Sequence, residues 1–170
     1  LVSVSTNGVL AESYAYDALW RRALTTTQEG TVRHVYGRKW QVLADLDGAG
    51  NVLRSYTWGG GIDNLLAARV GAKAYATLTD AQGTVWGLVG GDGEIAARWT
   101  YDAWGNVLSE EVTDPDLAAF RYRFQGREYS AATGLVNFRA RWYDPETGRW
   151  LSKDPIRLQG GVNLYAFCSN

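Results

Sequence analysis

The sequence predicts an all-β fold in which antiparallel hairpins stack side by side into one spiral, solenoid-like sheet. Three observations lead to this fold class: a recurring strand pattern that begins with glycine, the near absence of helical periodicity, and aromatic residues in phase with the repeats. The 170 residues include 20 glycines, 8 tryptophans and 10 tyrosines. A chain of this length can bury one sizeable core.

The repeated pattern is a glycine, a variable residue, a β-branched residue and then alternating strand-like sequence. Its copies are GTVRHVY from Gly30, GNVLRSY from Gly50, GTVWGLV from Gly83, GEIAARW from Gly93, GNVLSEE from Gly105 and GLVNFRA from Gly134. Glycine tolerates positive φ and a preceding aspartate caps a turn, so each copy is interpreted as the second strand of a hairpin. A single hairpin cannot bury its apolar face, and we therefore expect the hairpins to pair edge to edge into a curling sheet.

Two segments depart from the strand pattern. IDNLLAARVGAKAYA, from Ile62, places Leu65 and Arg69 at helical spacing from Ile62 before it reaches Gly71, and DPDLAAF follows from Asp114. Both segments are candidates for a short helix or a turn.

Composition excludes several classes of function. The 17 Lys and Arg residues are balanced by 18 Asp and Glu residues, so no basic surplus predicts a nucleic-acid partner or an anionic membrane surface. The sequence contains no apolar run of about 20 residues, the length that would predict a membrane span. Cys168 and His34 are the only residues of their types, so neither a metal site nor a cofactor is predicted. His34 is interpreted as a strand residue, because a Ser-His-Asp triad through it would lack a GxSxG elbow.

The tryptophans allow two interpretations. Because they recur in phase with the repeat, we interpret them as repeat core. The alternative is a glycan-binding or adhesive surface module, in which Trp40, Trp58, Trp86 and Trp99 would form exposed stacking rows. The chain also has no methionine and opens on strand-like sequence, so we expect a processed product or a piece of a longer protein.

A second motif is Tyr-Asp followed by a turn, as in YDALWR from Tyr16, YDAWGN from Tyr101 and YDPETGR from Tyr143. The copy at Tyr16 has Trp20 where the pattern has glycine, and we expect an altered turn there. These copies resemble the tyrosine-aspartate repeats of the Rhs family, which is related to toxin-complex C subunits and teneurins.

The resemblance is strongest over residues 120–167, which are similar to the Rhs repeat-associated core segment. The matching positions are Arg123, Phe124, Gly126, Tyr129, Thr133 to Leu135, Arg139 to Pro145, Gly148 to Ile156 and Gly160 to Tyr165. The resemblance implies a hairpin array over residues 1–119 and a core segment over 120–170 that turns inward and plugs one end of a hollow β-shell. It also implies that the shell encloses a C-terminal, toxin-like polypeptide, and that neighbouring shell segments are further protein partners.

In many bacterial members of the family, the core is also an aspartyl autoprotease that releases this polypeptide. Asp154, in SKDPIR, matches the first catalytic aspartate, and Arg141, in RARWYDP, matches an arginine of the same site. Such a mechanism needs two carboxylates that share one proton. The second aspartate belongs to a D-P-x-G-L element that these 170 residues do not contain, so this stretch is expected to be inactive as it stands.

Two neighbouring residues bear on that site. Asp144 could replace the missing aspartate, but its YDPETG context reads as a β-turn, which already explains an aspartate there. Arg157 stands where the family has glycine, which predicts a different turn and a positive charge near Asp154.

A structural shell segment is therefore the main hypothesis, with autoproteolysis in a longer parent protein and glycan binding as the two alternatives. The resemblance further implies a secreted or cell-surface protein of a bacterial effector or toxin system.

Overall fold

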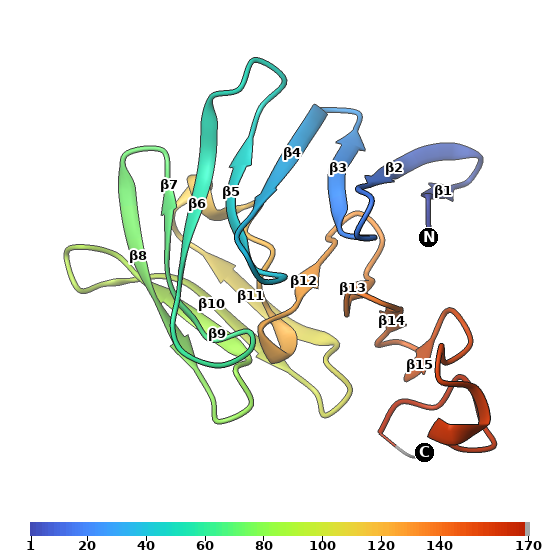
Figure 1. The fold of residues 1–170 in the computed structure, drawn as a ribbon. Helices are drawn as coiled ribbons and strands as arrows, with labels where there is room; N and C mark the ends of the chain where they lie inside the picture. Colours follow the sequence, from blue (N-terminus) through green and yellow to red (C-terminus); the bar gives the residue numbers. More distant parts are fainter. Residues whose placement is uncertain (169–170) are drawn as a thin grey trace.

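The computed structural model describes residues 1–168 and contains one large and one small antiparallel sheet (Figure 1). The large sheet has 11 strands, and each strand pairs with the next strand in the sequence. We call this sheet the wall. Its strands are β1 (Ser3–Thr6), β2 (Val9–Tyr16), β3 (Arg22–Thr27), β4 (Gly30–Tyr36), β5 (Val42–Leu46), β6 (Val52–Trp58), β7 (Leu65–Val70), β8 (Lys73–Thr79), β9 (Val85–Val89), β10 (Ile95–Tyr101) and β11 (Val107–Val112). The predicted array of stacked hairpins is thus confirmed.

Residues 113–168, which we call the C-terminal segment, carry the small sheet. Its strands, paired in sequence order, are β12 (Glu128–Tyr129), β13 (Val136–Asn137), β14 (Trp142–Asp144) and β15 (Arg149–Trp150). Three short 3₁₀ helices accompany them: η1 (Pro115–Leu117), η2 (Phe124–Gly126) and η3 (Arg157–Gly160). Figure 1 shows the wall curling, with the part of the C-terminal segment that carries β12 lying inside the curl. The predicted inward turn is confirmed for the part of the segment that carries β12.

One of the two expected helix or turn segments is a pair of strands. Residues 65–70 form β7, which pairs with β6 on one side and with β8 on the other, and the hairpin turns at Gly71 with φ of 56°. Pairing with two neighbours overrode a weak local helical preference. At the second segment a short helix is present: η1 starts after Asp114, whose side chain accepts a hydrogen bond from the Asp116 amide.

The main core lies between the concave face of the wall and the C-terminal segment. Tyr56, Leu65 and Trp99 of the wall pack in one cluster with Phe120 and Tyr122 of the C-terminal segment. The Tyr122 ring meets the Tyr56 ring edge-on, with centroids 4.8 Å apart. The boundary between residues 119 and 120 therefore crosses a shared core, and its meaning as a domain division stays a prediction.

An aspartate turn recurs in the wall, after β2, β8 and β10 at one rim and after β5 at the opposite rim. At Asp47 the carboxylate Oδ1 accepts from the amides of Ala49 and Asn51, at 2.9 and 2.8 Å, and Gly50 closes the turn with φ of 91°. The same bonds form at Asp17, Asp80 and Asp102. This geometry explains the aspartate of the Tyr-Asp motif, because one side chain satisfies two amides that the turn leaves free.

The turn at Asp17 keeps this geometry even though Trp20 replaces glycine. The Trp20 amide donates to the Asp17 carbonyl at 3.0 Å, as the Gly50 amide does to the Asp47 carbonyl at 3.1 Å. Trp20 adopts φ of 61°, a left-handed conformation that costs a residue with a Cβ atom about 1 kcal/mol. The expectation of an altered turn is therefore wrong: the backbone is unchanged and Trp20 carries the strain.

The aromatic residues at strand ends tie neighbouring strands together. The Trp58 indole donates to the Val42 carbonyl at 2.7 Å, and the Tyr101 hydroxyl donates to the Val85 carbonyl at 2.8 Å. Each bond reaches back 16 residues to the neighbouring strand, from β6 to β5 and from β10 to β9. The aromatics thus combine apolar burial with a fixed polar bond, which supports their interpretation as repeat core.

Candidate functional site

The features with possible chemistry lie where the C-terminal segment meets the wall, and along the C-terminal segment itself. The R-F-x-G motif makes the first attachment. Arg123 is 1% exposed, and its guanidinium donates two hydrogen bonds to the Glu110 carboxylate of β11, at 3.1 and 2.9 Å. The same guanidinium lies 4.5 Å from the ring centre of Trp99. A planar guanidinium can pair and stack at once, which a lysine cannot do.

The glycine of that motif allows the closest backbone contact. A Cβ atom on Gly126 would lie 2.6 Å from the Asp63 carbonyl oxygen, and Gly126 has φ of 64°. The neighbouring residue Phe124 covers Gly105 in the same way, since a Cβ there would lie 2.6 Å from the ring. The motif therefore encodes docking onto the wall.

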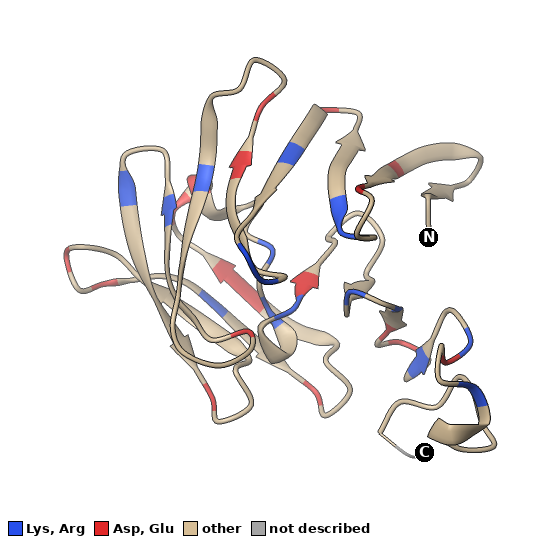
Figure 2. Ribbon diagram, viewed as in Figure 1, with Lys and Arg blue, Asp and Glu red and all other residues tan. Residues whose placement is uncertain are grey.

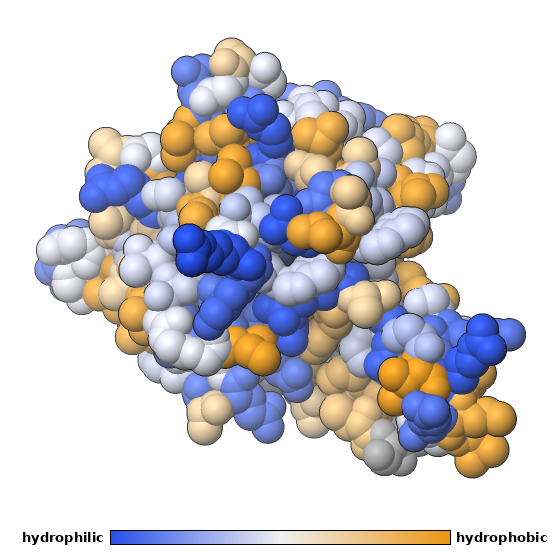
Figure 3. Space-filling model, in the orientation of Figure 1, coloured by the Kyte–Doolittle hydropathy of each residue, from blue (hydrophilic) through white to orange (hydrophobic). Residues whose placement is uncertain are grey.

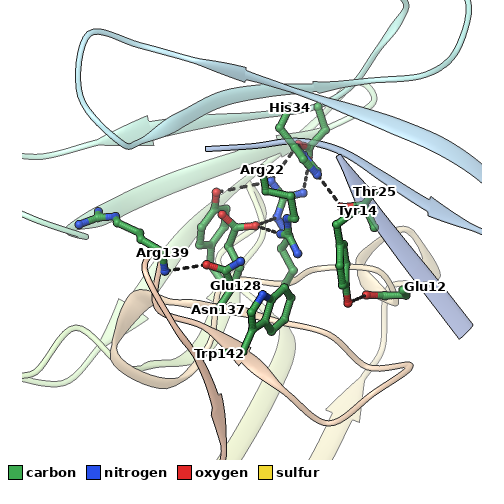
Figure 4. Close-up of polar contacts among 12 residues, drawn as sticks. Glu12, Tyr14, Arg22, Thr25, His34, Glu128, Asn137, Arg139 and Trp142 are labelled. Carbon is green, nitrogen blue, oxygen red and sulfur yellow. Dashed lines mark hydrogen bonds and ion pairs between the residues drawn. The ribbon is translucent and has the colours of Figure 1, made fainter. Parts of the chain in front are cut away.

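A second attachment is a buried cluster of charged residues (Figure 4). Asp45 of β5 is 0% exposed and accepts two hydrogen bonds from the Arg121 guanidinium. Arg121 Nε also lies 3.0 Å from the Glu128 carboxylate, which forms a further ion pair with Arg22 of β3. Two carboxylates and two guanidiniums therefore neutralise one another between the wall and the C-terminal segment.

His34 completes this cluster. Its Nδ1 lies 2.8 Å from Asp45 Oδ1 and its Nε2 lies 2.9 Å from the Thr25 hydroxyl. Burial lowers the pKa of the His34 imidazole, and the nearby Arg121 charge lowers it further. Although burial opposes ionisation of Asp45, Arg121 and His34 hold the pKa of that carboxyl well below its usual range.

The order Thr25, His34, Asp45 is that of a catalytic triad, but its electrostatics argue against catalysis. In a triad, the carboxylate stabilises the imidazolium that forms when histidine accepts a proton. Here the Asp45 carboxylate is already paired with Arg121, and the lowered pKa of His34 makes it a weak base. His34 lies in β4, as predicted, and the arrangement is structural.

The structure brings together the two residues predicted from the family resemblance. Arg141 Nη1 lies 2.9 Å from Asp154 Oδ2, and the Arg141 guanidinium stacks 4.0 Å from the Trp150 ring centre. The other Asp154 oxygen accepts from the Ile156 amide at 2.9 Å. Asp154 is thus oriented by a cation and an amide, and both side chains keep about a fifth of their surface exposed, at 19% and 18%.

Asp144 is occupied in its own turn: one carboxylate oxygen accepts from the Glu146 amide at 3.0 Å and the other from the Thr147 hydroxyl at 2.7 Å. Arg157 has φ of 57°, the conformation that glycine favours, so the substitution kept a glycine-like backbone there. Within the described residues, the ion partner of Asp154 is Arg141 rather than Arg157.

The four tryptophans considered for glycan stacking have different environments. Trp99 is 1% exposed and lies in the core, and Trp58 is half-buried, whereas Trp40 and Trp86 are 41% and 40% exposed. They do not form one exposed row. Figure 2 shows Lys and Arg interleaved with Asp and Glu over the ribbon, and Figure 3 shows scattered apolar surface that includes the C-terminal end. Among residues 1–168, no helix is long and apolar enough to cross a bilayer.

Comparison with known families decides the identity of this fold. The family model described as teneurin YD-shell matches residues 1–170. The chain belongs to the teneurin YD-shell family. The predicted resemblance to the Rhs and YD-repeat proteins is thereby confirmed.

Relatives and solved structures extend this assignment of the YD-shell chain. It is 33% identical over 163 residues to the tRNA3(Ser)-specific nuclease WapA of Bacillus spizizenii, a match that covers 93% of this chain and 7% of the relative. It is 35% identical over 108 residues to double-stranded DNA deaminase toxin A of Burkholderia cenocepacia, covering 61% of this chain and 7% of the toxin. The chain therefore spans a small fraction of these relatives.

The crystal structure of TcdB2-TccC3-Cdc42 matches the whole YD-shell chain with a TM-score of 0.74 at 22% identity, over 9% of that chain. The Photorhabdus luminescens Tc holotoxin pore matches 99% of this chain with a TM-score of 0.72 at 19% identity, again over 9% of that chain. At these identities the likeness shows the fold.

Sequence reasoning found Arg141 and Asp154 but missed the buried charged cluster. Strand alternation does not reveal it, because the buried residues of β5, Val42 and Asp45, stand three positions apart. A buried charged residue requires a partner of opposite charge, but the sequence identifies neither the burial nor the partner.

Proposed function

We propose that this YD-shell chain forms a closing part of a protein shell, and that the shell encloses a polypeptide C-terminal to the chain. The observation that carries the proposal is the burial of the C-terminal segment in the concave side of the wall, through Phe120, Arg121 and Arg123. In the proposed shell, the curled wall forms part of the boundary between inside and outside, with its own segment fixed on the inner side. The relatives named for nuclease and deaminase activities support a toxic enzyme as the enclosed polypeptide, and a secreted or cell-surface location.

Protease protection tests this proposal in the longer protein that we propose carries the chain. The enclosed polypeptide should resist protease until the shell is denatured. Phe120→Ala removes a ring that is 2% exposed and should make the polypeptide cleavable, because it loosens the C-terminal segment from the wall. Leu108→Ala, at an outer position that is 67% exposed, is the matched control and should leave protection intact. If protease digested the polypeptide in the native, unaltered protein as fast as in the denatured protein, enclosure would be contradicted.

A second candidate function is autoproteolysis, which the ion pair of Arg141 and Asp154 favours. In this proposal Asp154 is one carboxylate of an aspartyl dyad, and Arg141 orients it or stabilises developing negative charge. The second carboxylate would come from the sequence beyond this chain. A fixed, partly exposed carboxylate next to a cation is suited to that role.

The test compares Asp154→Asn with Asp144→Asn in the longer protein by intact mass. Both substitutions remove one carboxylate from the C-terminal segment, and Asp144 is held in its own turn. Processing should be abolished in Asp154→Asn and retained in Asp144→Asn. Arg141→Lys, which keeps the charge but loses the planar contact with Trp150, should slow processing. Processing that continues at the normal rate in Asp154→Asn would exclude the role.

A further inference from the structure

The buried charged cluster is balanced only while His34 is uncharged. Asp45 and Glu128 contribute two negative charges, and Arg22 and Arg121 contribute two positive charges. His34 is 6% exposed, so a proton bound to it would add an unbalanced charge in a poorly hydrated interior. An unbalanced buried charge is strongly unfavourable.

We propose that His34 acts as a proton-operated latch that holds the C-terminal segment against the wall at neutral pH and loosens it in acid. The contact that opens is the one between Asp45 on β5 and Arg121, together with the pairing of Glu128 with Arg22. This inference concerns two parts of one chain, and it does not depend on enclosure of a second polypeptide.

Every group that faces His34 fits this assignment. Thr25 and Arg22 approach from β3, Asp45 from β5, and Arg121 and Glu128 from the C-terminal segment. The Tyr56 hydroxyl, from β6, donates to the second Asp45 oxygen at 2.7 Å. A protonated His34 would compete with Arg121 for the same carboxylate and would be repelled by both arginines.

The segment that responds should be the one that contributes Arg121 and Glu128 to the cluster, and its other attachments to the wall are those of Arg123 and Gly126. Residues 121–129 include β12, a strand of two residues, whereas most wall strands pair with a neighbour on each side. The polar bonds that anchor this stretch at Arg121 and Glu128 converge on the cluster itself. Loss of the cluster therefore weakens residues 121–129 before it weakens β7 to β10.

The wild-type 170-residue protein can be tested directly, since His34 is its only histidine. NMR of the imidazole reports protonation of His34 alone, and amide hydrogen exchange reports opening of residues 121–129, from about pH 7.5 to about pH 4.5. Protection of these amides should fall by up to about tenfold per pH unit once the pH drops below about 6.5, the ordinary pKa that His34 regains when the contact opens, and should level off below the lower pKa of the closed state. Amides of β7 to β10 should change less than twofold.

His34→Gln, which cannot take up a proton, should remove this pH response. Unchanged protection in the wild type would overturn the latch, as would an equal fall in His34→Gln. The second result would point to Asp63, whose pKa is raised by burial and which pairs with Arg127 and Arg139. If His34→Gln fails to fold, the wild-type data decide: protection that starts to fall only below the His34 midpoint seen by NMR, where His34 is protonated in both states, contradicts the proposal.

Discussion

Asp45 and Arg121 lie 76 residues apart in the sequence and form a bidentate ion pair in the interior of the protein. The Asp45 carboxylate has no exposed surface, and the Arg121 side chain is 12% exposed. This pair connects a central strand of the wall to the C-terminal segment. A buried pair is costly to break because the remaining charge stays in the interior.

Arg121→Met should therefore lower the free energy of unfolding by about 3–5 kcal/mol, as measured by urea denaturation. Asp45→Asn alone should also destabilise. The double variant should lose less than the sum of the single losses, because neither charge is then left unpaired. Additivity of the two losses to within about 0.5 kcal/mol would show that the pair is not coupled.

Two glycines in the same turn position provide a matched pair. Gly50 and Gly105 both have φ of 91°, but a Cβ on Gly50 meets no atom within 4 Å, whereas one on Gly105 would lie 2.6 Å from the Phe124 ring. Gly50→Ala should cost about 1 kcal/mol through backbone strain alone. Gly105→Ala should cost several-fold more, because Phe124 must also move. Thermal denaturation measures both variants, and equal losses would contradict tight docking of Phe124.

Trp20→Gly should stabilise the protein. Trp20 has φ of 61° and is 79% exposed, so glycine relieves backbone strain and little packing is lost. The expected gain is about 0.5–1 kcal/mol in the free energy of unfolding. Trp20→Ala keeps the Cβ atom and is the control, with no gain expected. A loss of stability in Trp20→Gly would mean that the indole contributes packing that outweighs the strain.

Alkaline pH should unfold the protein cooperatively. Burial raises the pKa of Tyr143 to about 12, and burial together with a hydrogen bond to Asp114 raises the pKa of Tyr75 to about 12. Burial also raises the pKa of Tyr56 and Tyr122 well above their usual value. A tyrosine with a raised pKa stabilises the fold below its unfolded value of about 10, and this contribution is lost as pH rises through the folded value.

Ultraviolet absorbance at alkaline pH measures the ionisation of these tyrosines directly, because ionised tyrosine absorbs at longer wavelength. The affected tyrosines should stay protonated to about pH 11 in the folded protein and should ionise together when circular dichroism shows unfolding. Denaturant should shift their ionisation to about pH 10. Gradual ionisation of these tyrosines in the folded protein would contradict their burial.

The sequence by itself determined the local architecture. Glycine and aspartate fix each turn through backbone φ and a side-chain hydrogen bond to nearby amides, so the hairpins and their order could be predicted from short stretches. The family motif also identified Arg141 and Asp154, and the structure places them 2.9 Å apart. The turn residues can be recognised in the sequence because they act over a few residues. Arg141 and Asp154 can be recognised because they belong to a motif with many matching positions.

Only the tertiary structure decided which distant residues meet. Whether Asp45 pairs with Arg121, or Arg123 stacks on Trp99, depends on the accumulated twist of the wall and on where the C-terminal segment enters its curl. The conformation of Leu65–Val70 also depended on tertiary structure, since pairing with the two neighbouring strands outweighed a local helical pattern. Non-local pairing and burial do not follow from sequence spacing, and for this reason the charged cluster was visible only in the folded chain.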